Sequence, residues 1–148
     1  ALSIVKQIMT KRHASVLIPY RKKVDSEYEF YLQMRDAHVS ESPNVFSFFG
    51  GGMEAGESPS ECLVREIKEE LCINISDFNL FKTYEFNVGD RHVFYLEAGN
   101  EFENDVVVME GQYGEFLTFR QIMTEMPVSD RTKIIIKEFS SRYLGNKI

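Results

Sequence analysis

The segment from residue 50 to residue 73 constrains the fold more than any other part of this sequence. A short apolar stretch runs into three consecutive glycines at 50–52, where the absence of side chains lets the backbone approach a ligand closely. Ser58 is then a good helix N-cap, Pro59 suits the first helical position, and Glu61 completes a Ser-x-x-Glu capping box. We therefore expect a strand, a glycine-rich turn and a helix in direct succession.

The expected helix has one apolar face and one acidic face. Apolar residues recur at helical spacing and form the expected buried stripe, Leu63, Val64, Ile67 and Leu71. Glu66, Glu69 and Glu70 are related as i, i+3 and i+4, so their carboxylates share the other face. Such a face is ordinarily solvated, because an exposed like-charge pair costs only a few tenths of a kcal/mol. Alternatively, a divalent cation neutralises it, and hard oxygen ligands of this kind suit Mg²⁺ or Mn²⁺.

Elsewhere the pattern mixes strands and helices without regular alternation. Strands are expected at 13–20, 27–34, 81–86, 91–98 and 106–109, and helices at 118–125 and 130–144. The expected core residues of the last helix are Ile134, Ile135, Phe139 and Tyr143. This mixture predicts an α/β (α+β) protein in which a mixed β-sheet is sandwiched between helices.

The glycine-rich turn and the acidic helix together resemble the Nudix box, G-x5-E-x7-R-E-U-x-E-E-x-G-U, in which U is a bulky aliphatic residue. The matching positions are Gly51, Glu57, Arg65, Glu66, Ile67, Glu69, Glu70 and Ile73. The departure is Cys72, where the pattern has the glycine that eases the exit from the helix with a positive φ. Two further stretches, 84–92 and 110–116, are similar to MutT-type members of the Nudix hydrolase family.

The resemblance implies a Nudix fold, hydrolysis of a nucleoside diphosphate linked to a further group, and a Mg²⁺ (or Mn²⁺) cofactor. The implied catalytic and metal-binding carboxylates are Glu66, Glu69 and Glu70, with the Gly51 carbonyl and the Glu110 carboxylate as additional metal ligands. The base that takes the proton of the attacking water stays open among Glu66, Glu69, Glu110 and Glu115. Glu57 and Arg65 are implied as a structural pair that holds the turn against the helix.

The same resemblance implies a nucleotide pocket formed by Arg35, Phe48, Arg91 and Asp130. Phe48 either stacks on a base or belongs to the core. Asp130 has a competing use as a helix N-cap, shared with Ser129. Asparagine would be expected at Asp130 for reading a purine edge, so the aspartate argues against a specificity for oxidised guanine.

Length, charge and cysteine content indicate the domain number, the kinds of partner and the cellular compartment to expect. The length of 148 residues favours a single domain over residues 1–148, and the net charge of −6 disfavours an extended nucleic-acid or membrane surface. No apolar run approaches the roughly 18 residues that span a bilayer. Cys62 and Cys72 would lie about 15 Å apart on one helix, too far for a disulfide, which fits a reducing cytoplasm.

The leading hypothesis is a MutT-like pyrophosphohydrolase that acts on a nucleoside triphosphate. A dinucleotide, a nucleotide sugar or an RNA 5′ end is the alternative substrate within the same reaction class. The alternative from another class is a non-catalytic Nudix domain that binds a nucleotide or a protein. The intact set of Glu66, Glu69 and Glu70 favours catalysis. The sequence leaves a homodimer open.

Overall fold

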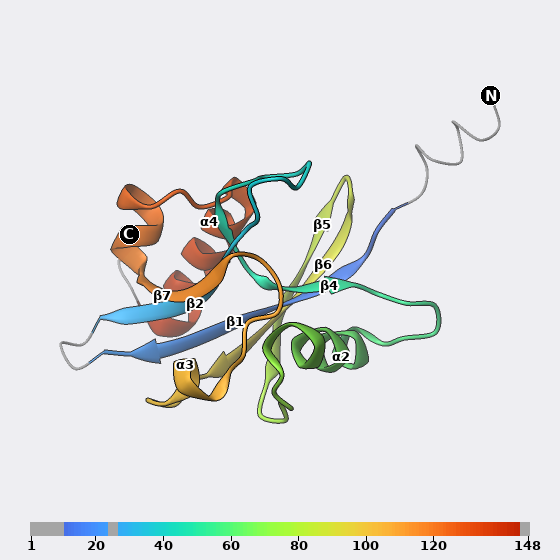
Figure 1. Cartoon of the computed structure of the whole chain (residues 1–148), viewed down its shortest axis with the longest axis horizontal. Helices are drawn as coiled ribbons and strands as arrows, with labels where there is room; N and C mark the ends of the chain where they lie inside the picture. The colour runs from blue at the N-terminus through green and yellow to red at the C-terminus, as the bar shows by residue number, and fades with distance from the viewer. Residues whose placement is uncertain (1–10, 24–26, 146–148) are drawn as a thin grey trace.

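The structure is a computed structural model that describes residues 11–23 and 27–145. Its strands form one sheet in the order β3-β2-β1-β6-β5, with β4 paired to β1 and β7 paired to β2 (Figure 1). The strands are β1 (Ala14–Lys22), β2 (Tyr28–Met34), β3 (Phe46–Ser47), β4 (Phe49–Gly52), β5 (Asn79–Phe86), β6 (Gly89–Glu97) and β7 (Tyr113–Thr118). Since β1 and β6 run parallel and the other paired strands are antiparallel, the sheet is mixed, as predicted.

Two helices lie on opposite sides of this sheet (Figure 1). They are α2 (Pro59–Leu71) and α4 (Asp130–Phe139). A cluster of buried side chains that includes Phe30, Phe46 and Phe139 packs with α4, and a second cluster that includes Phe49 and Leu63 packs with α2. Smaller helical elements are α3 (Phe102–Asp105) and the π-helical turns η1 (Gln121–Glu125) and η2 (Ser140–Leu144). The predicted arrangement of a mixed sheet between helices is confirmed.

Both ends of α2 follow from local sequence. The Ser58 side chain accepts a hydrogen bond from the Glu61 N–H, and the Glu61 side chain accepts one from the Ser58 N–H, so the predicted capping box is present. At the other end Cys72 takes the left-handed conformation, with φ 58° and ψ 31°, and its N–H donates to the Lys68 carbonyl. The helix therefore leaves by the route that a glycine would favour, despite the cysteine side chain.

The expected strand at 106–109 is wrong. The Val107 N–H donates to the Leu71 carbonyl and the Met109 N–H to the Glu70 carbonyl. This apolar segment is therefore hydrogen-bonded to the last turn of α2. The strand of this region is β7, which pairs with β2 and was not expected from the sequence. An apolar run alone does not show which backbone groups will satisfy its N–H donors.

The expected helix at 118–125 contains the single turn η1, and the expected helix at 130–144 corresponds to α4 followed by η2. Two of its four expected core residues are wrong: Ile135 and Phe139 are buried, but Ile134 is 55% and Tyr143 52% exposed. Tyr143 is only partly covered because it packs on the rings of Phe139 and Phe81 at the rim of the core.

Cys62 and Cys72 are free thiols, in agreement with the expectation of no disulfide. In the part of the chain that the structure describes, no helix combines the length and the apolar character needed to cross a membrane.

Candidate active site

A cavity of about 1710 Å³ extends across the sheet from the glycine strand to the far edge. Its lining includes Gly51 on β4 and Glu70 at the end of α2, and it also includes Arg91 on β6 and Phe86 on β5. Because β4, β1, β6 and β5 are successive neighbours, roughly 14 Å separates the two ends of the cavity. We call them the glycine end and the Phe86 end. Sequence-predicted site residues that line this cavity are Gly51, Glu57, Glu70, Glu110, Arg35, Phe48, Arg91 and Asp130, whereas Glu66, Glu69 and Arg65 are not among its lining residues.

Glu70 is a nearly buried carboxyl group at the glycine end, with 6% of its surface exposed. Its Oε1 accepts a hydrogen bond from the Gly50 N–H at 2.9 Å. Burial raises the pKa of Glu70 to about 8 against the effect of this hydrogen bond, and the negative charges of Glu66, Glu110 and Glu69 add to the rise. The carboxyl group therefore sits among like charges that a bound cation would compensate.

Glu66 lies directly against the glycine strand. A Cβ placed on Gly51 would come within 2.4 Å of the Glu66 carboxyl carbon, so glycine at this position leaves the space that the carboxylate occupies. Burial raises the pKa of Glu66, and the hydrogen bond from Arg65 opposes that rise. The Gly51 carbonyl oxygen faces the same region and accepts a hydrogen bond from the Cys62 thiol at 3.3 Å. The Glu66 carboxylate thus occupies the space that a side chain at position 51 would fill.

Arg65 connects the glycine turn to the acidic face of α2. Its Nε donates to Glu57 Oε2 at 2.7 Å and its Nη2 donates to the Gly52 carbonyl at 2.9 Å. Its Nη1 contacts the carboxylates of Glu66 at 2.9 Å and Glu69 at 3.4 Å. The hydrogen bonds from Arg65 lower the pKa of Glu57 to about 2. The structure therefore contains the pair that the sequence predicts, and the same guanidinium also holds Glu66.

Glu110 reaches the glycine end because its loop is attached to α2. The Met109 N–H donates to the Glu70 carbonyl at 2.7 Å, which fixes the chain next to the buried carboxylate. The following Gly111 has φ +79°, and a Cβ there would come within 2.7 Å of both Gln33 Oε1 and the Met34 carbonyl. The turn after Glu110 thus requires glycine. Glu115, the other base candidate outside the box, is exposed on β7 and does not line the cavity.

The fit of a divalent cation depends on these carboxylates. Within residues 11–23 and 27–145, no three or more His, Cys, Asp or Glu side chains converge closely enough to form a preassembled metal group. Arg65 forms ion pairs with Glu66 and Glu69. The available donors are nevertheless carboxylate and carbonyl oxygens, and burial, with a smaller effect of the neighbouring carboxylates, raises the pKa of Glu70. The donor chemistry fits a hard divalent cation.

Phe48 and Arg35 each have a structural role as well as a place in the cavity wall. Phe48 is 9% exposed and belongs to the hydrophobic cluster that packs with α4, so the core interpretation and the cavity-lining interpretation both hold. Arg35 Nε donates to the carbonyls of Glu41 and Ser42 at 3.2 Å. Its guanidinium therefore holds the loop before β3 at the cavity.

Charged residues surround the Phe86 end. Arg91 Nη1 donates to the Arg12 carbonyl, and burial lowers the pKa of Arg91. The N-cap of α4 is Ser129, whose Oγ accepts from the Thr132 N–H, so the Asp130 carboxylate is not used for capping. Asp130 instead lines the cavity in the first turn of the helix.

The cavity lining that sequence reasoning missed includes Gln33, Phe86 and Arg131. Gln33 is buried on β2, and its Nε2 donates to the Phe48 carbonyl at 3.1 Å. Phe86 ends β5, and the Arg131 guanidinium lies 5.1 Å from the centre of its ring. The available signal was the alternation along β5, which places Tyr84 and Phe86 on one face of the strand.

Comparisons with known proteins agree with this architecture. A family model described as the NUDIX domain matches residues 9–134. The chain is 37% identical over 93 residues to an 8-oxo-dGTP diphosphatase of Escherichia coli, a match that covers 61% of this chain and 70% of the relative. It is 38% identical over 71 residues to an RNA pyrophosphohydrolase of Nitratiruptor, covering 45% of this chain and 41% of the relative.

Solved structures share the fold at low sequence identity. A MutT structure from a study of Aliivibrio salmonicida and Vibrio cholerae has a TM-score of 0.71 and 21% identity, and the match covers 90% of this chain and all of that one. The NUDIX domain of Shewanella oneidensis NrtR, solved with ADP ribose, has a TM-score of 0.72 and 12% identity. This match covers 93% of this chain and 91% of that one.

The chain belongs to the NUDIX domain family. Within it, the predicted class of a MutT-like Nudix hydrolase acting on pyrophosphate bonds is confirmed, as is the predicted fold. Members of this family generally use a divalent metal.

Proposed function

We propose that this protein is a Mg²⁺- or Mn²⁺-dependent pyrophosphohydrolase of nucleoside triphosphates. The observation that carries the proposal is the position of Glu70, a buried carboxyl group with a pKa raised to about 8, at one end of a cavity whose other end carries Phe86 and arginines. The acidic end suits cation-bridged phosphates, and the aromatic end suits a base. The names of the 8-oxo-dGTP diphosphatase relatives support a nucleoside triphosphate.

In this proposal the phosphates lie at the glycine end. Glu70, Glu66, Glu69 and Glu110, together with the Gly51 carbonyl, would hold the metal. The bound ion would neutralise phosphate charge and lower the pKa of a water molecule. A water molecule would attack phosphorus in line and displace phosphate or pyrophosphate, and Glu66, Glu69 or Glu110 would accept its proton.

The remaining side chains of the cavity would orient the substrate. Phe48 and Phe86 offer apolar surfaces to the base, and the guanidinium groups of Arg35 and Arg91 offer donors to sugar or phosphate oxygens. Asp130 accepts hydrogen bonds from the edge of a base. A cytoplasmic location, a homodimer and a single domain stay predictions from the sequence.

The test is release of phosphate and pyrophosphate from a panel of nucleotides, with Mg²⁺ and with a chelator. We expect release from at least one nucleoside triphosphate that requires metal and is lost in Glu70→Gln. Glu125→Gln is the matched control, because Glu125 is an exposed carboxylate outside the cavity. Absence of turnover across the panel with nucleotide binding retained would instead support a non-catalytic binding domain.

A second candidate substrate is the phosphorylated 5′ end of RNA. The RNA pyrophosphohydrolase relative favours it, although that match covers less than half of either chain.

A further inference from the structure

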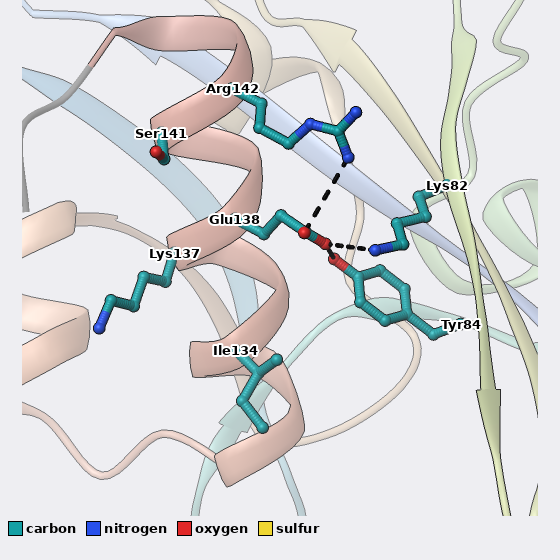
Figure 2. Close-up of a pocket in the computed structure, with 7 residues that line it drawn as sticks. All are labelled: Lys82, Tyr84, Ile134, Lys137, Glu138, Ser141 and Arg142. Atoms are coloured by element: carbon teal, nitrogen blue, oxygen red, sulfur yellow. Dashed lines mark hydrogen bonds and ion pairs between the residues drawn. The ribbon is translucent and has the colours of Figure 1, made fainter.

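A second cavity, of about 630 Å³, lies between β5 and the C-terminal helical segment. Lys82 and Tyr84 approach it from β5, Glu138 from α4, and Arg142 from η2 (Figure 2). Lys82, Tyr84 and Arg142 all point toward the Glu138 carboxylate. The polar groups of this cavity are therefore directed at one carboxylate, which joins the edge strand of the sheet to the last helix.

The bond between Tyr84 and Glu138 is the closest of these contacts. The Tyr84 hydroxyl donates to Glu138 Oε1, and Lys82 Nζ donates to the same oxygen at 2.9 Å. Burial raises the pKa of Tyr84, whereas these hydrogen bonds lower the pKa of Glu138, so the phenol keeps its proton and the carboxylate its charge at neutral pH. A hydrogen bond to a charged acceptor is shorter and stronger than one between neutral groups.

Arg142 contributes less to this attachment. Its side chain is 58% exposed, and its Nη1 meets Glu138 Oε2 at 4.0 Å, the outer limit of an ion pair. Such a long, exposed contact adds little to the stability of a protein. The attachment of α4 to β5 at this point therefore depends on the bonds that Tyr84 and Lys82 make to Glu138 Oε1.

A second contact joins α4 to β5 in the wall of the active-site cavity. The Arg131 guanidinium lies 5.1 Å from the centre of the Phe86 ring, and both residues line that cavity. Arg131 and Glu138 are seven residues apart on α4, which places them on one face of the helix, two turns apart. Tyr84 and Phe86 are two residues apart on β5, which places them on one face of the strand. The helix and the strand therefore meet at two points, one at the cavity and one outside it.

The two contacts are linked through the aromatic rings of β5. The rings of Tyr84 and Phe86 are stacked, with centroids 5.8 Å apart and planes inclined by 7°. Both side chains are half-buried and pack against the core cluster that includes Phe139 of α4. A shift of the Tyr84 ring is therefore passed to the Phe86 ring, because closely packed side chains have little free space to absorb it.

We propose that Tyr84 and Glu138 are positioning residues for the Phe86 end of the active-site cavity, and that their hydrogen bond fixes the Phe86 ring and the first turn of α4 for binding the nucleotide base. This inference rests on the proposed function, in which Phe86 offers its surface to the base. Neither Tyr84 nor Glu138 lines the active-site cavity, so neither would touch the substrate. The hydrogen bond would act on KM and leave the glycine end, roughly 14 Å away across the sheet, unaffected.

The test removes the hydrogen bond while changing the side chains as little as possible. Tyr84→Phe deletes only the donor hydroxyl, Glu138→Gln keeps an acceptor oxygen without the charge, and Glu138→Ala removes the acceptor. Tyr28→Phe is the matched control, because Tyr28 is a half-buried tyrosine of β2 that lines neither cavity. Each protein is assayed for kcat and KM on the nucleoside triphosphate that the wild type hydrolyses best, and for Mn²⁺ affinity by electron paramagnetic resonance.

We expect Tyr84→Phe to raise KM about fivefold and to leave kcat and Mn²⁺ affinity unchanged, because part of the contribution of a hydrogen bond to a charged group is lost at the base end alone. Glu138→Ala should raise KM by a similar factor. The double variant should raise KM no further, because both substitutions break the same bond. Glu138→Gln should fall between wild type and Glu138→Ala, since its amide oxygen still accepts a hydrogen bond from the Tyr84 hydroxyl. Tyr28→Phe should match wild type.

Fluorine NMR reports on the position of Phe86 without any turnover. In protein labelled with 4-fluorophenylalanine, the Phe86 signal is assigned by its loss in Phe86→Leu. That signal should shift in Glu138→Ala and stay in place in Glu125→Ala, since Glu125 is an exposed carboxylate outside both cavities.

Three kinetic results would overturn the inference. The first is an unchanged KM in Tyr84→Phe. The second is an additive rise of KM in the double variant, which would mean that the two side chains act separately. The third is a loss of kcat or of Mn²⁺ affinity as large as the rise in KM, which would mean a general structural role. If the wild type hydrolyses no nucleotide, the proposed function fails, and an unshifted Phe86 signal in Glu138→Ala would separately overturn the positioning role.

Discussion

Replacing Glu70 by glutamine should stabilise the metal-free protein at neutral to alkaline pH, even though it removes a residue of the proposed catalytic site. Burial raises the pKa of Glu70 from its ordinary value of 4.5 to about 8. Between those pH values the folded chain retains a proton that the unfolded chain has released. The free energy of unfolding therefore decreases as pH rises, by up to about 1.4 kcal/mol per pH unit.

The size of the effect follows from the two pKa values. Their difference corresponds to a ceiling of about 5 kcal/mol at pH 8, and structural relaxation reduces it to a few kcal/mol. Glutamine has no proton to lose, and its side-chain oxygen can still accept the Gly50 N–H. The difference in stability between Glu70→Gln and wild type should thus be near zero at pH 4.5 and grow steadily toward pH 8.

Urea unfolding followed by circular dichroism, with a chelator present at pH 5 and pH 8, measures this difference. Adding Mg²⁺ should reduce the difference at pH 8, because a ligand at one hundred times its dissociation constant stabilises the wild-type protein by about 2.7 kcal/mol. Glu125→Gln is the control at both pH values. If the difference in free energy of unfolding between Glu70→Gln and wild type is the same at pH 5 and pH 8, the reasoning is refuted.

Three further substitutions probe the same region. Glu57→Gln should lower the melting temperature at pH 7 but match wild type near pH 2, because hydrogen bonds from Arg65 lower the pKa of Glu57 to about 2 and the stability they provide is lost as pH falls from 4.5; an equal difference at both pH values would contradict this. Cys72→Gly should stabilise the protein by about 1 kcal/mol, raising the melting temperature by about 2–4 °C, since φ is 58° at this position; a lower melting temperature would show that the thiol has an unrecognised role. Gly51→Ala should reduce turnover, because the new Cβ would lie 2.4 Å from the Glu66 carboxyl carbon and would displace that side chain; full activity would mean that turnover does not depend on the present position of Glu66.

The helix α2 could be predicted from sequence because its determinants are local. The capping box of Ser58 and Glu61 sets its start, and the spacing of Leu63, Ile67 and Leu71 sets its buried face. The same locality places Glu70 in the cavity lining and the Glu66 carboxylate against Gly51. The cysteine in place of the usual glycine predicted an altered loop geometry at the helix exit, and this was wrong, because Cys72 takes the left-handed conformation that glycine favours.

Features that depend on tertiary contacts could not be predicted. The segment at 106–109 has the composition of a strand, but its N–H groups are satisfied by the last carbonyls of α2, and this attachment brings Glu110 to the site. Periodicity correctly indicated a helix at 130–144, but the buried face of α4 runs through Thr132, Ile135, Ile136 and Phe139, and Ile134 falls outside it.

Several of the predicted site residues line one cavity, and their functional roles stay predictions. Phe48 and Arg91 were expected at a nucleotide pocket, and both line the cavity. Phe86 was assigned only to a strand, and its place in the cavity depends on how β5 packs beside α4. Glu115 was considered as a base because of its sequence position, but β7 directs that part of the chain away from the cavity.

The most direct test of the account is a crystal structure with Mn²⁺ and a non-hydrolysable nucleoside triphosphate analogue, in which anomalous scattering locates the metal. We expect Mn²⁺ within ligand distance of a Glu70 oxygen, bridging to the phosphates at the glycine end. Phosphates bound elsewhere, with no metal beside Glu70, would contradict the central claim that the acidic face of α2 collects cations around a polyphosphate.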